Sequence, residues 1–253
     1  ALDSLVNQSL QEIEIIVVND GSTDHSMTIL KEYAEIDKRI RIIDKANSGY
    51  GHSMNVGINA ATGMYLGILE PDDFVPPNMF EELAQTADKA EADFVKANFY
   101  RFVVNDDGVM EKTLFRLTTK GSYYGRVINP AVEKEVFRFV MNTWSGIYRI
   151  SFLNKWNIRH NETPGASYQD NGFFFQTFCR AERVWFVNKP YYMNRRDNPN
   201  SSMFSKKKFY AVTDEYRFIY QFLQNDYEHL KVFEPYYYFR KLSNFITTYY
   251  RLD

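Results

Sequence analysis

Segments typical of buried strands alternate with segments typical of amphipathic helices through the first 103 residues. Residues 13–18 (Ile-Glu-Ile-Ile-Val-Val) are largely apolar and β-branched, and turn-forming residues follow them directly, as expected of a strand buried on both faces. Further strands are predicted at 40–43, 64–69 and 93–103. Helices are predicted after Asp24, at 51–61, and after Pro77 through Ala90. This alternation predicts an α/β fold with a mostly parallel central sheet flanked by helices.

The pattern changes after residue 103. The tight-turn sequence Asn105-Asp106-Asp107-Gly108 separates two strand-like runs and predicts a hairpin. Helical segments are predicted near 130–141 and 170–181, with an irregular loop around 161–165 between them.

The C-terminal end is rich in aromatic residues. The chain has 21 Phe, 19 Tyr and 3 Trp, and 16 of these lie in the last 50 positions. Two amphipathic patterns, near 206–224 and 234–250, predict a helical appendage there. We therefore divide the chain into a first domain, 1–205, and an appendage, 206–253. The favoured interpretation of the aromatic excess is packing against the first domain; a surface for a partner subunit or a membrane is the alternative.

Composition and charge exclude several classes of protein. The 253 residues have a formal net charge of −2, which offers no basic field to a phosphate backbone, so we expect no nucleic-acid partner. The single Cys179 excludes an intramolecular disulfide and a cysteine-based zinc cluster. No run approaches the roughly 18 apolar residues that a membrane-spanning helix needs.

Residues 19–24 (Asn-Asp-Gly-Ser-Thr-Asp) form the first of three polar clusters. They follow a predicted strand, and ligands of open α/β sheets bind at the carboxyl ends of strands. The glycine permits a sharp turn, hydroxyls and amides can face an anion, and Asp20 can accept hydrogen bonds from a base or ribose. A helix cap explains the same residues equally well.

The acidic sequence Glu70-Pro71-Asp72-Asp73 follows the strand predicted at 64–69. Carboxylates this close repel one another unless a cation balances them. Oxygen ligands suit Mg²⁺ or Mn²⁺, and such an ion would bring phosphate oxygens with it. The alternative is a solvated loop in which Asp73 caps the next helix.

Asp170 opens the third cluster, at the start of a predicted helix that contains Phe173, Phe174, Phe175 and Phe178. A carboxyl group beside apolar side chains has a higher proton affinity than one in water, which suits a general base. Ordinary helix capping is the alternative.

In this order and spacing, the segments resemble family 2 glycosyltransferases of the GT-A fold, close to bacterial enzymes that build capsular and other surface polysaccharides. The resemblance extends from the first residue to about residue 203. The matching segments are 5–10 (LVNQSL), 13–24 (IEIIVVNDGSTD), 47–63 (NSGYGHSMNVGINAATG), 65–75 (YLGILEPDDFV), 165–181 (GASYQDNGFFFQTFCRA) and 190–192 (PYY). The family pattern also begins with a strand ending in a Pro-x-Tyr-Asn-like motif, so we expect such a strand before Ala1.

The resemblance implies a nucleotide-sugar site. Asp20 would hydrogen-bond the base of the donor. The other residues implied in donor binding are Ser22, Lys45, Gly49, Asn55 and Asp72.

The resemblance also implies a metal site and a base. Asp72 would be the main ligand of Mg²⁺ or Mn²⁺, with Glu70 and Asp73 beside it, and Asp170 would deprotonate the acceptor hydroxyl. Some positions depart from the family pattern: Glu70 replaces the usual first Asp of the D-x-D motif, Gln169 replaces the usual Glu of an E-D pair, and Ser53-Met54 replaces the common Ala-Arg. These departures make the contact of Glu70 with the metal doubtful and leave Asp170 as the only base.

The implied activity is an inverting, metal-dependent transfer from a nucleotide-diphosphate sugar, a UDP-sugar in most of the family, to a saccharide or lipid-linked saccharide. The alternative is a nucleotide-sugar-binding subunit with little transferase activity. A nucleotidyltransferase is less favoured, because no glycine-rich, Arg/Lys-bearing first loop is present. The expected location is the cytoplasm, at the inner face of the membrane, with a homo-oligomer or peripheral membrane contact formed through the C-terminal helices.

Overall fold

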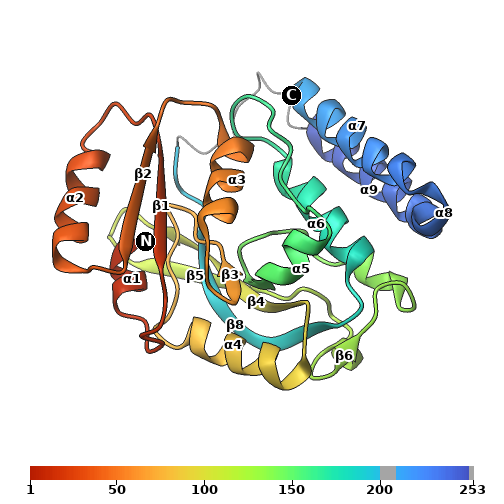
Figure 1. Ribbon diagram of the computed structural model, residues 1–253, viewed down its shortest axis with the longest axis horizontal. Helices are drawn as coiled ribbons and strands as arrows, with labels where there is room; N and C mark the ends of the chain where they lie inside the picture. Colours follow the sequence, from red (N-terminus) through yellow and green to blue (C-terminus); the bar gives the residue numbers. More distant parts are fainter. Residues whose placement is uncertain (200–208, 251–253) are drawn as a thin grey trace.

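A parallel pair of strands opens the fold. The structure is a computed structural model that describes residues 1–199 and 209–250 (Figure 1). Strands β1 (Ile15–Asp20) and β2 (Ile40–Lys45) pair in parallel. Helix α2 (Ser26–Ile36) packs beside β2, and helix α3 (Tyr50–Ala60) packs against β1. The carboxyl ends of β1 and β2 therefore meet at one edge.

The larger sheet has six strands. Its order is β3-β7-β4-β8-β6, and β5 pairs with β4 off this path. In chain order the strands are β3 (Tyr65–Gly67), β4 (Phe94–Val104), β5 (Met110–Phe115), β6 (Val127–Ile128), β7 (Gly146–Arg149) and β8 (Val184–Arg195). Strands β4 and β8 pair in parallel, whereas the pairs β3·β7, β4·β7, β4·β5 and β6·β8 are antiparallel.

This pairing confirms the α/β class and corrects one detail of it. We predicted a mostly parallel sheet, but the larger sheet is mixed. The short turn at Asn105–Gly108 returns the chain directly from β4 to β5, and a turn this short permits only antiparallel pairing. Strand β7 then enters between β3 and β4, antiparallel to both.

Helices cover both faces of the larger sheet (Figure 1). On one side lies α4 (Met79–Ala90), whose buried residues Met79, Leu83, Ala87 and Ala90 follow helical spacing. On the other side lie α5 (Ile150–Lys155) and α6 (Gln169–Arg180). The short helix α1 (Leu2–Val6) lies at the N-terminal end.

Helix α6 joins the sheet to the rest of the core. Phe178 packs on Phe94 of β4, with ring centroids 4.9 Å apart, and Phe173 meets Tyr148 of β7 edge-on at 5.1 Å. All its residues from Asn171 to Cys179 are buried.

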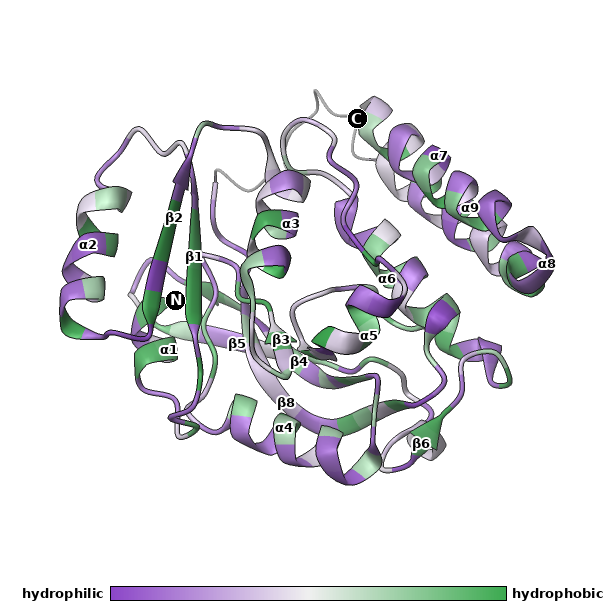
Figure 2. Ribbon diagram, in the orientation of Figure 1, coloured by the Kyte–Doolittle hydropathy of each residue, from purple (hydrophilic) through white to green (hydrophobic). Residues whose placement is uncertain are grey.

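The C-terminal helices form a layer against α6, as Figures 1 and 2 show. They are α7 (Phe209–Asn225), α8 (Tyr227–Leu230) and α9 (Glu234–Tyr249). The buried apolar residues of this layer include Val212, Tyr216, Ile219, Leu223, Tyr237 and, in the 3₁₀ segment Lys231–Phe233 before α9, Phe233. Among the described residues, no helix has both the length and the apolar character needed to cross a bilayer.

The predicted packing role applies to some of the aromatic residues of this layer and not to others. Tyr216 and Tyr237 lie in the core, as that interpretation expects, whereas Tyr238, Tyr249 and Tyr250 are exposed. The predicted boundary at 205/206 lies outside the described residues.

Two other expectations from the sequence were wrong or incomplete. The helix predicted at 130–141 is only a 3₁₀ segment, Lys134–Arg138, because the chain becomes extended at Phe139. Its carbonyl groups at Phe137 and Phe139 accept hydrogen bonds from Arg240 of α9 instead of continuing a helix. Strand β8 was not predicted; it contains Pro190, where its register against β4 shifts.

Phe137 connects the C-terminal layer to the core and provides a test of this packing. Its fully buried ring contacts Phe175 and Phe178 of α6 as well as Phe233 and Tyr236 of the C-terminal layer. We expect Phe137→Ala to lower the free energy of unfolding by about 3–5 kcal/mol, because it leaves a cavity between the two parts.

Urea denaturation followed by circular dichroism measures this loss. Val132→Ala, at a side chain that is 76% exposed, is the control and should change stability by no more than about 0.5 kcal/mol. Equal, small effects of both substitutions would contradict the packing role.

Candidate functional site

Asp20 and Lys45 face each other at the carboxyl ends of β1 and β2. The Lys45 ammonium donates hydrogen bonds to the Asp20 carboxylate and to the Ser48 hydroxyl. The backbone N–H groups of Ser48 and Gly49 donate to the two Asp20 oxygens at 2.9 and 3.0 Å. Burial acts to raise the pKa of Asp20, but the hydrogen bonds from Lys45 and the two amides outweigh it and hold the pKa below its usual value. Asp20 is therefore an anion at the start of α3.

Ser22 lies on the exposed turn after β1, where its backbone N–H donates to Asn19 Oδ1 at 3.3 Å. Gly21 brings this turn against the segment after β2, since a Cβ there would lie 2.9 Å from the Asn47 nitrogen. The turn that carries Ser22 therefore lies beside the segment that follows Lys45.

The first turn of α3 touches the loop before α6. Gly49 has a φ of 93°, and a Cβ there would lie 2.9 Å from the Gly165 nitrogen. The Tyr50 N–H donates to the Gly165 carbonyl at 2.9 Å. Segments more than 100 positions apart in the sequence therefore meet at Gly49, where only glycine fits.

Asn55 lies one turn further along α3 and is buried. Its amide nitrogen donates to the His160 carbonyl and to Glu162, and its oxygen accepts from the His160 N–H at 2.8 Å. These contacts hold the loop around 160–162. The predicted contact of Asn55 with a nucleotide sugar stays a prediction.

Glu70 follows β3 and lies beside α3. The Tyr50 hydroxyl donates to Glu70 Oε1 at 2.8 Å, and the Glu70 N–H donates to the Tyr192 hydroxyl oxygen at 3.0 Å. Burial raises the pKa of Glu70 to about 7 against the lowering effect of the Tyr50 bond, and neighbouring carboxylates, Asp170 among them, add to the rise.

Asp72 and Asp73 differ in their surroundings. Asp73 is buried and accepts hydrogen bonds from the Asn194 amide and, at 2.7 Å, from the Arg195 N–H. It thereby anchors the end of β8 rather than capping α4, which begins only at Met79. Asp72 is less enclosed and accepts a hydrogen bond from the Asn198 amide at 3.0 Å.

The acidic loop is suited to a divalent cation that a substrate helps to hold. The hydrogen bonds that described residues donate to Glu70, Asp72 and Asp73 come from uncharged groups. The charge of Arg195 also acts on Asp72. Within residues 1–199 and 209–250, no group of three or more His, Cys, Asp and Glu side chains could hold a metal ion. Mg²⁺ is commonly held by one or two carboxylates together with substrate phosphates. The carboxylate oxygens of this loop are ligands of that kind.

Asp170 lies in the first turn of α6, after Tyr168 in the left-handed region (φ 65°). Burial raises the pKa of Asp170 to about 6, although the Asn171 amide and the Lys96 charge oppose the rise. Its charge in turn helps to raise the pKa values of Tyr50 and Glu70. The second and third polar clusters therefore share one environment.

Lys96 is a member of this environment that the sequence prediction missed. It is 2% exposed, and its ammonium donates to the Asn142 carbonyl and side-chain oxygens at 2.9 and 2.7 Å and to the Tyr148 hydroxyl at 3.2 Å. Burial lowers the pKa of Lys96 well below its usual value. A lysine in the middle of the apolar run FVKANF was the signal that could have identified it.

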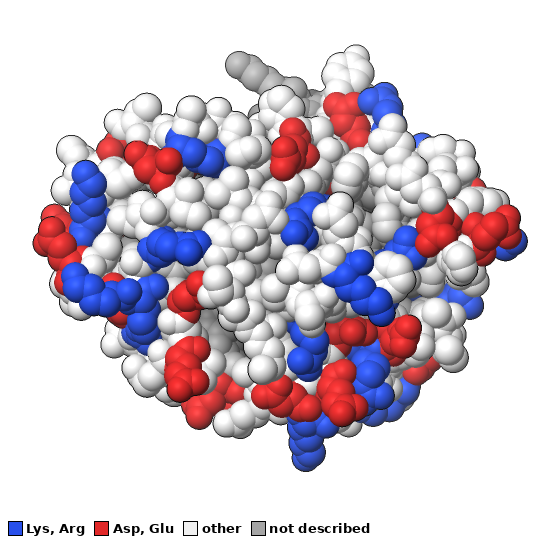
Figure 3. All heavy atoms as spheres, viewed as in Figure 1, with Lys and Arg blue, Asp and Glu red and all other residues white. Residues whose placement is uncertain are grey.

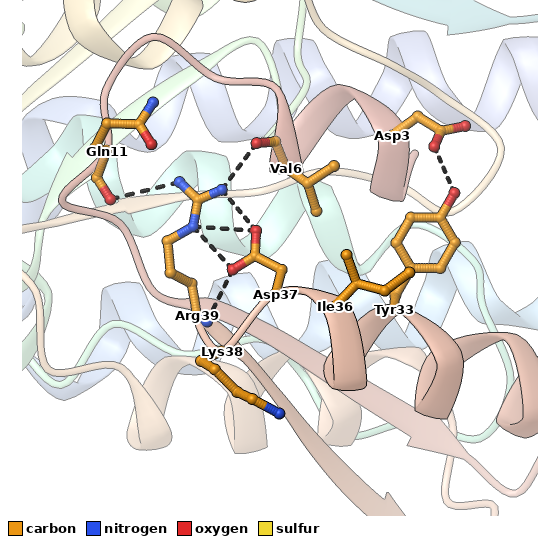
Figure 4. Close-up of a pocket in the computed structure, with 8 residues that line it drawn as sticks. All are labelled: Asp3, Val6, Gln11, Tyr33, Ile36, Asp37, Lys38 and Arg39. Carbon is orange, nitrogen blue, oxygen red and sulfur yellow. Dashed lines mark hydrogen bonds and ion pairs between the residues drawn. The ribbon is translucent and has the colours of Figure 1, made fainter.

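A surface pocket beside α2 is separate from these clusters (Figure 4). Its Arg39 guanidinium donates hydrogen bonds to the Asp37 carboxylate and the Val6 carbonyl, so the charges of Arg39 and Asp37 balance one another. It lies at the start of β2, whereas Lys45 lies at the end of that strand. Over the face seen in Figure 3, basic and acidic residues are interspersed.

Comparisons with known proteins identify the family and the fold of this chain. The family model described as glycosyl transferase family 2 matches residues 1–153. The uncharacterized glycosyltransferase EpsJ of Bacillus subtilis (strain 168) is 34% identical over 202 residues, which are 79% of this chain and 57% of EpsJ. The chain therefore spans little more than half the length of that relative.

Two solved structures share the fold. One is S. aureus TarS (residues 1–349) in complex with UDP-GlcNAc, with a TM-score of 0.65 and 18% identity over 98% of this chain and 76% of that one. The other is the mannosyltransferase PcManGT of Pyrobaculum calidifontis in complex with GDP-Man and Mn²⁺, with a TM-score of 0.60 and 13% identity over 99% and 66% of the two chains. The predicted GT-A type of fold is confirmed.

Glu70→Gln tests the environment of the acidic loop. A carboxyl group whose pKa rises on folding, here from 4.5 to about 7, makes the native state less stable as pH increases through that interval. We expect the melting temperature of the variant to equal that of the wild type at about pH 4, below both pKa values, and to exceed it at about pH 8.

Thermal unfolding across this pH range measures the difference. Glu12→Gln, on the exposed segment before β1, is the matched control and should show no pH-dependent difference. A constant offset for Glu70→Gln at every pH would contradict the assigned environment.

Proposed function

Because the chain belongs to glycosyl transferase family 2 and is a glycosyltransferase, we propose that it catalyses an inverting, metal-dependent transfer from a UDP-sugar to a saccharide or lipid-linked saccharide in polysaccharide biosynthesis. The observation that carries the proposal is the shared environment of Asp170 and the acidic loop next to the start of α3. Such an arrangement would place a general base and a bound cation beside the same substrate.

Asp20 and Lys45 are proposed to bind the nucleotide, with Ser22 and Gly49 beside them. The Asp20 carboxylate accepts two hydrogen bonds at Oδ1 and one at Oδ2, of the roughly four that a carboxylate can accept. Its Oδ2 therefore has capacity for one more donor, such as an N–H of the base or a ribose hydroxyl. The UDP-GlcNAc complex of TarS supports a uridine nucleotide.

Asp72 is proposed to be the main metal ligand, with Glu70 as the second. Both Asp73 oxygens already accept hydrogen bonds that anchor β8, so Asp73 is the weakest of the three predicted ligands. A bound Mg²⁺ or Mn²⁺ would neutralise the charge of the departing diphosphate. The Mn²⁺ in the PcManGT complex supports this assignment.

Asp170 is proposed to be the general base. A pKa of about 6 keeps it mostly ionised near neutral pH while leaving it basic enough to accept the proton of an acceptor hydroxyl. Gln169 is buried, and its side chain holds the preceding loop through Thr163 and Ser167. Attack from the face opposite the departing diphosphate would invert the anomeric carbon.

The wider setting belongs to the same proposal. Residues 1–205 would form the transferase domain, and the enzyme would act in the cytoplasm at the inner face of the membrane. The exposed Tyr238, Leu242, Ile246 and Tyr249 of α9 follow helical spacing, which supports contact with a membrane or a second copy.

Thermal-shift measurements with nucleotide sugars test donor and metal binding. We expect UDP-GlcNAc with Mn²⁺ to raise the melting temperature, because a ligand at about 100 times its dissociation constant stabilises the native state by about 2.7 kcal/mol. Asp72→Asn should remove the part that depends on Mn²⁺. Asp106→Asn, in the exposed hairpin turn, should retain it; loss in both variants, or in neither, would contradict the metal assignment.

Asp170→Asn tests the base. Without a proton acceptor, the turnover number should fall about 10²–10⁴-fold, whereas the thermal shift with UDP-GlcNAc should remain. In the wild type, turnover should fall as pH decreases below about 6, because Asp170 then becomes protonated.

Release of UDP in the presence of an acceptor extract measures the rates. Unchanged turnover in the variant would rule out Asp170 as the base. Donor binding by the wild type without any turnover would favour the alternative, a nucleotide-sugar-binding subunit.

A further inference from the structure

Glu215 of α7 reaches across to the first turn of α6. Its side chain is 1% exposed. Its Oε1 accepts the Gly172 N–H at 2.7 Å, and its Oε2 accepts the Asn161 amide at 3.0 Å. One carboxylate of the C-terminal layer therefore holds both the helix that carries Asp170 and the loop before it.

This contact satisfies a need of α6. Gly172 is the fourth residue of α6, so the usual partner of its N–H is the carbonyl of the N-cap, Tyr168. That carbonyl accepts the Asn171 N–H at 2.9 Å, and the Gly172 N–H is donated to Glu215. A Cβ at position 172 would lie 2.3 Å from Glu215 Oε1, so glycine is what allows the approach.

A second contact holds the other side of Asp170. The Tyr168 hydroxyl, two residues before Asp170, shares a hydrogen bond with the Thr248 hydroxyl of α9. Contacts from α9 and α7 thus bracket Asp170 at positions 168 and 172. Both come from a region beyond residue 153, where the family match ends.

A contribution to the stability of the fold does not explain why a carboxyl group is buried at position 215. Burial raises the pKa of Glu215 to about 8, and the charge of Asp170 adds to the rise. A buried ionisable group costs desolvation free energy, and an apolar residue of similar size is often no less stable.

We propose that Glu215 is a positioning residue, which fixes the first turn of α6 and the loop at Asn161 so that the Asp170 carboxylate is held toward the acceptor. The C-terminal layer is then part of the active site, through contact with the base-bearing helix. This inference rests on the proposed role of Asp170 as the base.

Three substitutions separate positioning from general stabilisation. Glu215→Ala removes both hydrogen bonds. Glu215→Gln keeps an oxygen that can accept the Gly172 N–H, and its amide nitrogen can donate to the Asn161 side-chain oxygen once the Asn161 amide group rotates by 180°. Leu223→Ala, two turns further along α7 at another buried residue, is the control for lost packing. If the Glu215→Ala protein does not fold, Glu215→Asp takes its place, because its side chain is one methylene shorter and moves the carboxyl oxygens away from Gly172 and Asn161.

Hydrogen–deuterium exchange tests the contact without any substrate. Glu215→Ala should speed exchange of amides 170–175 at least 10-fold, and Glu215→Gln less than 3-fold. Leu223→Ala, compared at an equal distance below its melting temperature, should not speed these amides selectively. Unchanged exchange in Glu215→Ala would overturn the proposal.

UDP release from UDP-GlcNAc with acceptor extract tests the consequence. Glu215→Ala should lower the turnover number at least 10-fold with the donor KM within 2-fold, and Glu215→Gln should recover most of it. In an Asp170→Asn background, Glu215→Ala should cause no further loss, because a positioning residue acts through the base. Faster exchange with normal turnover, or an additive loss in that background, would overturn the proposal.

An inactive wild type would instead contradict the proposed function, and the exchange result would still decide whether Glu215 holds the helix.

Discussion

The structure depends on the burial of helix α6 on nearly all sides. Its phenylalanines contact β4 and β7 of the larger sheet on one side and Phe137 with the C-terminal layer on the other. All residues of α6 from Asn171 to Cys179 are buried, and the sheet covers only one face of the helix. The layer of α7 and α9 supplies the rest of the cover, and in doing so brings Glu215 and Thr248 to the end of α6 that carries Asp170.

Ionisable groups around this helix end are held far from their usual behaviour. Burial raises the pKa values of Glu70, Asp170 and Glu215 to about 7, 6 and 8, and lowers that of Lys96. Shifts of this kind are frequent at active sites, because the arrangement that binds a charged substrate leaves like charges close together without it. A divalent cation with a nucleotide diphosphate would change this balance.

Much of the first half of the fold could be predicted from the sequence. Strands β1, β2 and β4, helices α3 and α4 and the hairpin after β4 lie close to their predicted positions, because hydrophobic periodicity and turn residues act over short distances. The 3₁₀ segment at Lys134–Arg138 and the antiparallel entry of β7 were not predictable in this way. They depend on a distant partner, Arg240 of α9 in the first case and the neighbouring strands in the second.

The sequence by itself determined the three polar clusters of the site, since Asp20, Asp72 and Asp170 each follow a local strand or helix signal. Only the tertiary structure decided how they meet: Gly49 packs against Gly165, Tyr50 bonds Glu70, and Glu215 holds Gly172. It also decided that Asp73 anchors β8 and that the charge of the buried Lys96 acts on Asp170. The physical reason is that hydrogen bonds and charge interactions across 100 residues depend on distance in space, which a local pattern does not encode.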